Sequence, residues 1–252
     1  MSWRDDLNYA KNIFKTGTPK EKWEYFWDYY KWHTIVLVLV IGFLGNVIYS
    51  NVTAKDYVLQ GFFFNTQGNE EAGAALGNDF LEAFPINSDK EDIFFATNYF
   101  LSVTDDAETL YNSYEVLQLI TAKLAAKEID FMVSDLATMN FLAYREFAAE
   151  LSEILTAEQM EQYEPYFLYF DRAFMKKLND TDTAVETMKE IVYPDPKKPE
   201  LMEDPVPMLI DVSHCESLKS LYPSSEKNYA IFFIAGSENH EKNLQFLEYL
   251  MQ

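Results

Sequence analysis

An uncharged stretch of 23 residues, 32–54, is the feature that most limits how this chain can fold. A helix rises about 1.5 Å per residue, so the stretch would reach about 34 Å, enough to cross a hydrocarbon layer of about 30 Å. Its centre, residues 35–48, contains eleven Ile, Val, Leu or Phe residues, which outweigh two glycines and one asparagine. The sequence therefore predicts one transmembrane helix, over residues 30–54.

Charges on the two sides of this stretch predict its orientation. Six basic residues precede it, whereas only Lys55 follows closely before a long acidic region. Basic residues favour the cytoplasmic side, so we expect residues 1–29 to form a cytoplasmic leader at the cell membrane and residues 55–252 an extracytoplasmic domain. The six basic residues before the stretch are Arg4, Lys11, Lys15, Lys20, Lys22 and Lys31.

Aromatic residues crowd the leader. Trp23, Trp27 and Tyr30 recur at helical spacing, so this part of the leader either anchors the chain at headgroup level or lies along the inner surface. Docking of a partner is the alternative role for these rings.

A cleaved signal peptide competes with the anchor. Small residues at Val52, Thr53 and Ala54 offer a cleavage site. A leader of about thirty residues before a long apolar run is more typical of an uncleaved signal anchor, which we favour.

Charge sets the outer part apart from the leader. The first fifty residues hold six basic and five acidic residues, which leaves 14 basic and 36 acidic residues and a net charge of −22 for the remainder. Such a field repels nucleic acid and anionic lipid, so neither is an expected partner. A solvated acidic surface without a specific ligand accounts for the same charge.

Strand and helix patterns alternate in the outer part. Apolar runs rich in aromatic and branched residues predict strands, and amphipathic or alanine-rich stretches predict helices. Three strand and helix pairs in succession favour parallel strands joined by helical crossovers, hence a three-layer α/β domain with its sheet covered on both faces. The strands are predicted at 57–64, 92–97 and 129–133, and the helices at 70–84, 107–126 and 136–151.

The later part of the chain is less regular. A short helix is predicted at 156–163, a strand or buried segment at 165–170, strands at 208–212 and 229–235, and a closing amphipathic helix at 238–251. Five prolines interrupt the polar, partly helical stretch 171–207, which therefore reads as a linker over the surface.

Several stretches resemble bacterial extracytoplasmic solute-binding proteins. Residues 119–133 (LITAKLAAKEIDFMV) are similar to that family's helix before a strand of the type Glu, Ile, Asp, hydrophobic, and residues 136–155 continue with its alanine-rich helix. Residues 210–218 (IDVSHCESL) and 229–250 (YAIFFIAGSENHEKNLQFLEYL) resemble its return strands and the helix that ends a lobe. The family has two α/β lobes that close on a ligand. Residues 151–207 are too short for a second lobe, so the resemblance implies a membrane-anchored, single-lobe relative of the periplasmic-binding-protein fold.

Polar residues follow the predicted parallel strands, where open α/β sheets bind ligands. Each has a structural alternative: Ser134 or Asp135 is placed to cap the next helix, and Asn98 and Tyr99 to lie in a solvated loop. The candidate ligand-binding residues are Thr66, Gln67, Asn98, Tyr99, Ser134 and Asp135, with Asn65 beside them.

Sequence motifs for catalysis and metal binding are absent. There is no nucleophile elbow, phosphate-binding loop, HExxH or nucleotide fingerprint, so we expect no enzyme activity and no cofactor. His214, Cys215 and Glu216 are adjacent, but consecutive side chains seldom point at one ion, so no metal site is expected. Cys215 is the single cysteine, and a buried, inert thiol is expected.

Three hypotheses for function follow. The first is a non-catalytic, single-pass membrane protein whose outer domain binds a small-molecule solute or a partner protein, such as a transporter. The second is a structural or assembly subunit of a membrane complex with no small-molecule ligand. The third, an extracytoplasmic hydrolase, requires an acid and a base gathered in a pocket.

Overall fold

The computed structural model describes residues 11–67, 70–101, 107–179, 191–223 and 228–252, with the backbone alone at 107–112. Contacts divide the chain into two compact units, Met1–Ala54 and Lys55–Gln252. Arg4, which contributed to the predicted orientation, lies outside the described residues.

One long helix, α2 (Pro19–Thr53), dominates the first unit. Thr18 caps its start, because the Thr18 hydroxyl accepts a hydrogen bond from the Glu21 N–H at 3.4 Å and the Glu21 carboxylate accepts one from the Thr18 N–H at 2.8 Å. A helical turn at residues 11–16 precedes this cap, and Phe14 packs edge-on against Tyr25 with ring centroids 6.0 Å apart. The helix is continuous from the leader into the apolar stretch.

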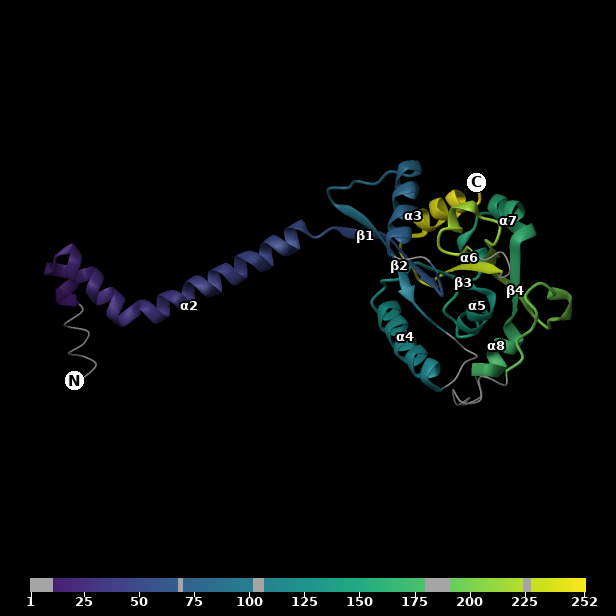
Figure 1. Ribbon diagram of the computed structural model, residues 1–252, viewed down its shortest axis with the longest axis horizontal. Helices are drawn as coiled ribbons and strands as arrows, with labels where there is room; N and C mark the ends of the chain where they lie inside the picture. Colours follow the sequence, from purple (N-terminus) through teal and green to yellow (C-terminus); the bar gives the residue numbers. More distant parts are fainter. Residues whose placement is uncertain (1–10, 68–69, 102–106, 180–190, 224–227) are drawn as a thin grey trace. The chain divides into compact units, whose positions relative to one another are not determined.

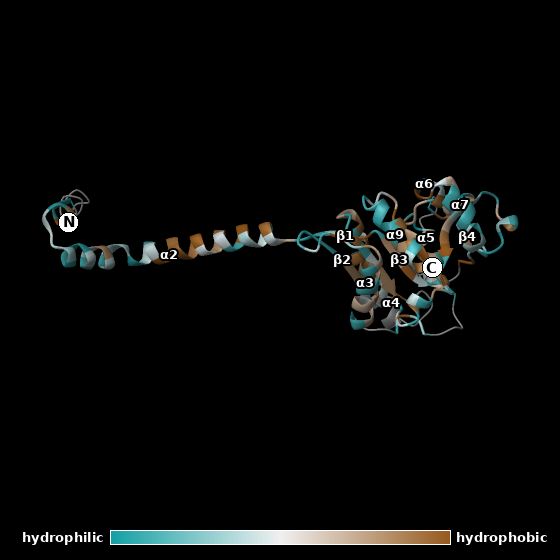
Figure 2. Ribbon diagram, turned by 90° about the horizontal axis from the view of Figure 1, so that it is seen from above, coloured by the Kyte–Doolittle hydropathy of each residue, from teal (hydrophilic) through white to brown (hydrophobic). Residues whose placement is uncertain are grey.

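The later part of α2 is strongly apolar, as the brown segments in Figure 2 show. None of its most apolar 18-residue window is buried inside the protein. By length and composition, α2 is a candidate membrane span or signal sequence near the amino terminus. The exposed Ile, Val and Leu side chains would be more favourable in a lipid bilayer than in water.

A six-stranded mixed sheet forms the centre of the second unit (Figure 1). β1 pairs in parallel with β2 and with β3, whereas β6, β5 and β4 continue the sheet through antiparallel pairs. The predicted parallel strands are confirmed, and the sheet as a whole is mixed. In the spatial order β2-β1-β3-β6-β5-β4, the strands are Glu91–Tyr99, Asp56–Phe64, Phe131–Asp135, Tyr229–Phe233, Pro205–Asp211 and Phe167–Asp171.

Helices cover both faces of the sheet, as predicted. On one face lie α3 (Glu70–Ala83), α6 (Leu151–Ile154), α7 (Ala157–Tyr163) and α9 (His240–Leu250). On the other face lie α4 (Ala107–Ala125), α5 (Leu136–Ala143) and α8 (Arg172–Asn179). Three short 3₁₀ turns, Glu164–Tyr166, Pro199–Leu201 and Glu216–Leu218, complete the described elements.

Aromatic rings pack the core under α3 and α9. Phe131 of β3 stacks on Phe246 of α9 with centroids 4.5 Å apart and meets Phe63 edge-on at 5.7 Å. Gly61 of β1 makes room for the Phe131 ring, because a Cβ at that position would lie 2.1 Å from Phe131 Cζ. This contact fixes how β1 and β3 lie against each other.

Asp130 ties the start of β3 to its neighbours from a buried position. Its carboxylate accepts hydrogen bonds from the Gln60 N–H at 2.7 Å, the Ser237 hydroxyl at 2.6 Å and the Asn239 side-chain amide at 3.1 Å. Buried carboxylates are tolerated where such donors surround them. The motif that carried the resemblance is therefore a structural junction here.

The helix predicted at 136–151 is shorter than expected. α5 ends at Ala143, and Glu146 adopts a left-handed backbone with φ of 63°. Ala148 then bridges to Ile234, and the Ala149 N–H donates to the Phe233 carbonyl at 2.9 Å. Pairing with the end of β6 therefore replaces the last helical turns that the alanine content suggested.

The stretch predicted as a linker, 171–207, is partly built into the domain. It contains α8 and the start of β5, including Pro205 and Pro207, while residues 180–190 lie outside the described part. Pro205 opens β5, and Pro207 pairs with Tyr169 beside a register shift. Strands tolerate proline at these two kinds of position because the missing N–H breaks no regular ladder bond there.

Candidate functional site

The carboxyl ends of β1, β2 and β3 bring the predicted site residues to one edge of the sheet. Asn65, Thr66 and Gln67 directly follow β1. Asn98 and Tyr99 are the last residues of β2 and not loop residues as predicted. Ser134 and Asp135 end β3.

Asn65 is the centre of a hydrogen-bond network at this edge. Its backbone is left-handed, with φ of 57°, a conformation that asparagine tolerates better than most residues. Its side-chain amide donates to Asp135 Oδ2 and to Thr138 Oγ1, both at 2.9 Å, and to the Leu101 carbonyl at 2.8 Å. Its Oδ1 accepts from the Leu101 N–H at 2.8 Å. The network joins the loop after β2 to β1 and β3.

Asp135 caps α5, which is the structural alternative considered for it. Its Oδ1 accepts from the Thr138 N–H at 3.1 Å. Ser134 is fully buried, and its hydroxyl donates to the Phe64 carbonyl at 3.2 Å. Both polar groups therefore serve the fold in this structure.

The remaining candidates divide into internal and exposed side chains. Thr66 is buried, and its hydroxyl donates to the Thr97 carbonyl at 2.7 Å. Tyr99 stacks on Phe62 with centroids 5.5 Å apart. The side chains of Gln67 and Asn98 are exposed, and the Asn98 amide reaches Glu70 Oε1 at 3.3 Å.

Sequence patterns missed Tyr222, which lies beneath the same edge. Its hydroxyl donates to the Phe64 carbonyl at 2.9 Å and to the Val133 carbonyl at 3.0 Å, and its ring packs on Tyr229 at 4.3 Å. Burial, with a smaller contribution from Asp135, raises the pKa of Tyr222 well above its ordinary value. A lone tyrosine in a loop after a 3₁₀ turn carries no periodic signal that would have revealed this role.

A groove lies away from that edge, between α3 and β2. It has a volume of about 290 Å³. None of the predicted site residues lines it, although Glu70, the partner of Asn98, does. Its lining residues are Glu70, Gly73, Ala74, Gly77, Asn78, Leu81, Asp92, Ile93, Phe94 and Phe95.

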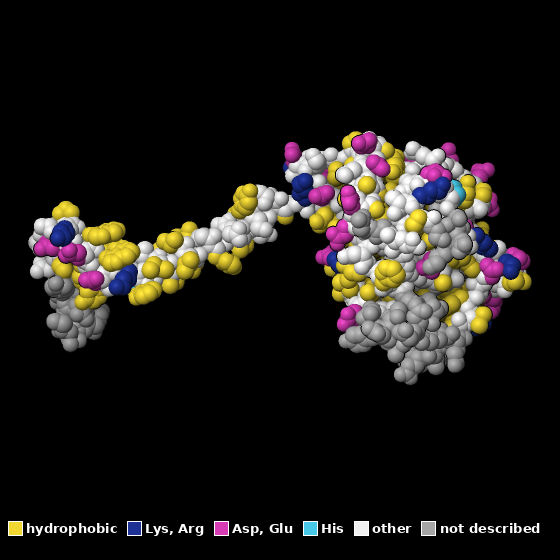
Figure 3. All heavy atoms as spheres, viewed as in Figure 1, with side chains coloured by type: hydrophobic (Ala, Val, Ile, Leu, Met, Phe, Trp, Pro, Cys, Tyr) yellow, Lys and Arg dark blue, Asp and Glu magenta, His cyan; other side chains and the backbone are white. Residues whose placement is uncertain are grey.

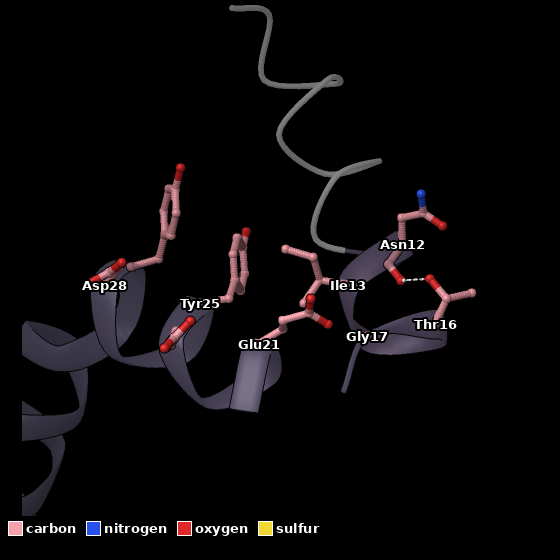
Figure 4. Close-up of a pocket in the computed structure, with 9 residues that line it drawn as sticks. Asn12, Ile13, Thr16, Gly17, Glu21, Tyr25 and Asp28 are labelled. Carbon is pink, nitrogen blue, oxygen red and sulfur yellow. Dashed lines mark hydrogen bonds between the residues drawn. The ribbon is translucent and has the colours of Figure 1, made fainter. Parts of the chain in front are cut away.

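A second hollow, of about 470 Å³, lies in the first unit between the turn at 11–16 and the start of α2. Figure 4 shows Ile13 directed toward Glu21 and Tyr25, whereas Thr16 turns aside and donates its hydroxyl to the Asn12 carbonyl at 2.8 Å. Tyr25 is nearly buried there, at 8% exposure. Most of the lining serves the capping box and the packing of this turn.

The adjacent residues His214 and Cys215, which were considered as metal ligands, have different surroundings in the structure. Cys215 is buried, and that burial raises the pKa of its thiol to about 12, so the thiol stays protonated and inert. His214 stacks on Tyr166 with centroids 4.6 Å apart. Within the described residues, no group of three or more His, Cys, Asp or Glu is arranged to hold a metal ion.

Acidic side chains are spread over the face of the second unit shown in Figure 3, among fewer basic ones. Ten ion pairs join described residues, and those in this unit are at least partly exposed. A basic partner would meet a complementary field on this unit.

Comparison with known proteins gives no match: no family model, no curated protein and no solved structure is similar to this chain.

Proposed function

We propose that α2 anchors this protein in the membrane with the amino terminus inside, and that the outer α/β unit binds another protein without catalysis. The exposed apolar helix and the excess of basic residues before it support the anchor and its orientation. The acidic surface of the outer unit supports a basic protein as the partner.

We favour a protein over a solute as the partner because the polar groups at the carboxyl ends of the parallel strands already have hydrogen-bond partners within the chain. Asn65, Asp135 and Thr138 use their polar atoms on one another, and Ser134 is buried beneath them. A solute would have to displace bonds of 2.9 to 3.1 Å that already satisfy these groups. The groove beside β2, in contrast, is open.

Binding of a small solute at the carboxyl edge is the second candidate function, and one observation favours it. The edge brings Asn65 and Asp135 within 2.9 Å of each other at the ends of parallel strands, the position where open α/β sheets bind ligands. This candidate keeps the likeness to a single solute-binding lobe, with the parallel strands β2, β1 and β3 as the part that such a lobe would share.

Purification from native membranes tests the proposal. Solubilised in mild detergent, the full-length chain should migrate as a complex larger than one chain of 29.4 kDa in its micelle. Sugars, amino acids and divalent cations should leave its unfolding temperature unchanged. A single chain per micelle together with a solute-dependent rise in that temperature would replace protein binding by the solute candidate.

The leader is tested in the same preparation. Deleting residues 1–29 should leave the complex intact if the outer unit holds the partner. Loss of the complex on that deletion would instead assign docking to the leader, as in the assembly-subunit hypothesis.

A further inference from the structure

β2 is an edge strand of the sheet. It pairs with β1 on one side, and no other described strand pairs with it on the other. It is nine residues long and contains no proline, and its register against β1 is regular from Ile93 to Ala96. The Ile93 N–H already donates to Asp92 Oδ1 at 2.9 Å, so the stretch of this edge without a proline or a side-chain cap lies at Phe95. Long edge strands without such protection are templates for pairing with another chain.

The register shows which backbone groups face outward. Gln60 of β1 points its backbone toward β3, because its carbonyl accepts from the Asp130 N–H at 2.8 Å. Gly61, the next residue, therefore points toward β2, where its register partner is Phe95. In a parallel ladder Gly61 bonds the residues on either side of its partner, so the N–H and C=O of Phe95 point away from β1.

The opposite edge of the sheet is protected. There the Tyr169 N–H of β4 donates to the Pro196 carbonyl at 2.8 Å, so a described loop segment occupies that edge. Proteins commonly cover an edge in this way to prevent pairing. Among the described residues no loop bonds to the backbone of Phe95 on its outer side, although Gly73 of α3 lies close to the Phe95 carbonyl, which a Cβ at Gly73 would approach to 3.5 Å.

α3 forms the second wall of the groove, close to β2. Gly73 permits this approach, because a Cβ there would lie 2.6 Å from Thr97 Cγ2, and Gly77 would place one 3.2 Å from Ile93 Cδ1. The groove therefore runs between an edge strand and a helix. Its volume of about 290 Å³ is at the lower limit of small-molecule sites and suits one or two side chains of an extended peptide.

The acidic side chains that line the groove indicate what charge a bound peptide would carry. Glu70 and Asp92 line the groove, and Glu70 has no cationic partner among the described residues, whereas Asp92 lies 3.9 Å from Lys55. A second copy pairing through its own β2 would bring Glu91 and Asp92 to an acidic groove, and like charges directly opposed are destabilising. A basic segment from a different protein fits the same place.

We infer that an extended, basic peptide segment of a partner protein adds to β2 as a seventh strand, with its side chains in the groove beside α3. Main-chain hydrogen bonds to Phe95 supply the affinity, and a lysine or arginine opposite Glu70 supplies the specificity. This inference rests on the proposal that the outer unit binds a protein, and it names where and by what chemistry.

Binding of a designed probe tests the groove. The probe is a fluorescent hexapeptide of alternating lysine and valine, titrated by anisotropy against the full-length chain in phosphatidylcholine nanodiscs, with empty nanodiscs as the blank. We expect saturable binding, no binding of the glutamate and valine counterpart, and slower amide exchange at Phe95 in the complex. Equal binding of the acidic peptide would overturn the inference, as would no binding up to about 1 mM.

Neighbouring residues of α3 provide matched controls. Ala74 lines the groove and Ala75 does not, although both are exposed. Ala74→Trp should weaken the probe at least about tenfold and Ala75→Trp less than about twofold. Glu70→Gln should weaken it about fivefold, while Glu71→Gln, outside the groove, leaves it unchanged. Should Ala74→Trp fail to fold, Asn78→Trp with Asp79→Trp as control repeats the comparison.

The outcomes separate the two proposals. Probe binding that Ala74→Trp leaves intact overturns the groove as the site. If Ala74→Trp preserves the detergent complex from native membranes, the groove inference fails and protein binding stands. If the complex is absent in the unmodified chain, the proposed function fails as well.

Discussion

In the parallel half of the sheet, β2, β1 and β3, a cluster of aromatic rings packs on one face, whereas in the antiparallel half, β6, β5 and β4, one carboxylate gathers backbone N–H groups at the end of a strand. In the first half, Phe131 lies over Gly61 and stacks on Phe246. In the second, Asp171 at the end of β4 accepts four backbone N–H groups, from Ala173, Phe174, Glu203 and Asp204. The two halves should therefore respond differently to substitution and to pH.

Gly61→Ala should have the largest effect on this comparison. The added Cβ would lie within 2.1 to 2.8 Å of three atoms of the Phe131 ring, which Phe246 and Phe63 prevent from moving aside. We expect a loss of about 3 kcal/mol, or about 6 to 12 °C in the unfolding temperature of the outer unit. Thermal unfolding of the full chain in detergent measures it.

A second glycine and a double variant control that measurement. The Cβ of Gly77→Ala would lie 3.2 Å from the flexible end of Ile93 and at ordinary contact distance, 3.6 Å, from the Phe95 ring, so we expect stability to change by less than about 1 kcal/mol. Adding Phe131→Leu to Gly61→Ala should cost less than the two single losses together, because the ring that clashes is gone. Strict additivity would contradict the proposed clash.

Asp171→Ala tests the antiparallel half. We expect its loss of stability to lie between those of Gly61→Ala and Tyr222→Phe. It leaves four backbone N–H groups without their carboxylate acceptor and should cost about 2 kcal/mol. The exposed Asp89 serves as the control, because Asp89→Ala should change stability by less than about 0.5 kcal/mol. An effect of Asp171→Ala no larger than that of Asp89→Ala would show that ring packing, not this carboxylate, holds both halves.

The pH dependence of the same residue follows from its hydrogen bonds. Burial alone would raise the pKa of Asp171, but the four N–H donors outweigh it and hold the pKa below its usual value. A carboxyl with a lowered pKa in the folded state stabilises the protein above its unfolded pKa of about 3.9, and the contribution is lost as pH falls through the folded value. Asp171→Asn should therefore flatten the decline in unfolding temperature below about pH 4. If the unfolding temperature of Asp171→Asn falls below about pH 4 as steeply as that of the unmodified protein, Asp171 does not cause the acid destabilisation.

Sequence patterns anticipated the parallel half better than the antiparallel half, and the reason is physical. Strands buried on both faces read as continuous apolar runs, as in residues 57–64, and their crossover helices show amphipathic spacing. Local signals also predicted that Ser134 or Asp135 would cap α5 and that Cys215 would be buried. These features depend on neighbours in the chain.

The antiparallel half depends on contacts between distant residues. Pro205 and Pro207 indicated a linker, yet pairing with β4 draws them into β5. The end of α5 at Ala143 follows from the Ala148 bridge to β6, which alanine content cannot reveal. At the candidate site, position was predictable from strand ends, but the internal bonds of Asn65 and the part played by Tyr222 required the fold.

Tyr222→Phe should have the smallest effect. It removes one hydroxyl from a residue that makes both a ring contact and hydrogen bonds, and the ring contact stays. That hydroxyl donates to Phe64 and Val133 of the parallel half from a loop before β6. The ring would remain on Tyr229, and Ser134 still donates to the Phe64 carbonyl, so we expect a loss of about 1 kcal/mol, or about 2 to 4 °C. Tyr229→Phe is the control, since that hydroxyl makes no hydrogen bond with a described residue. Equal losses in both variants would mean that ring packing alone, and not the hydroxyl, joins the loop to the parallel strands.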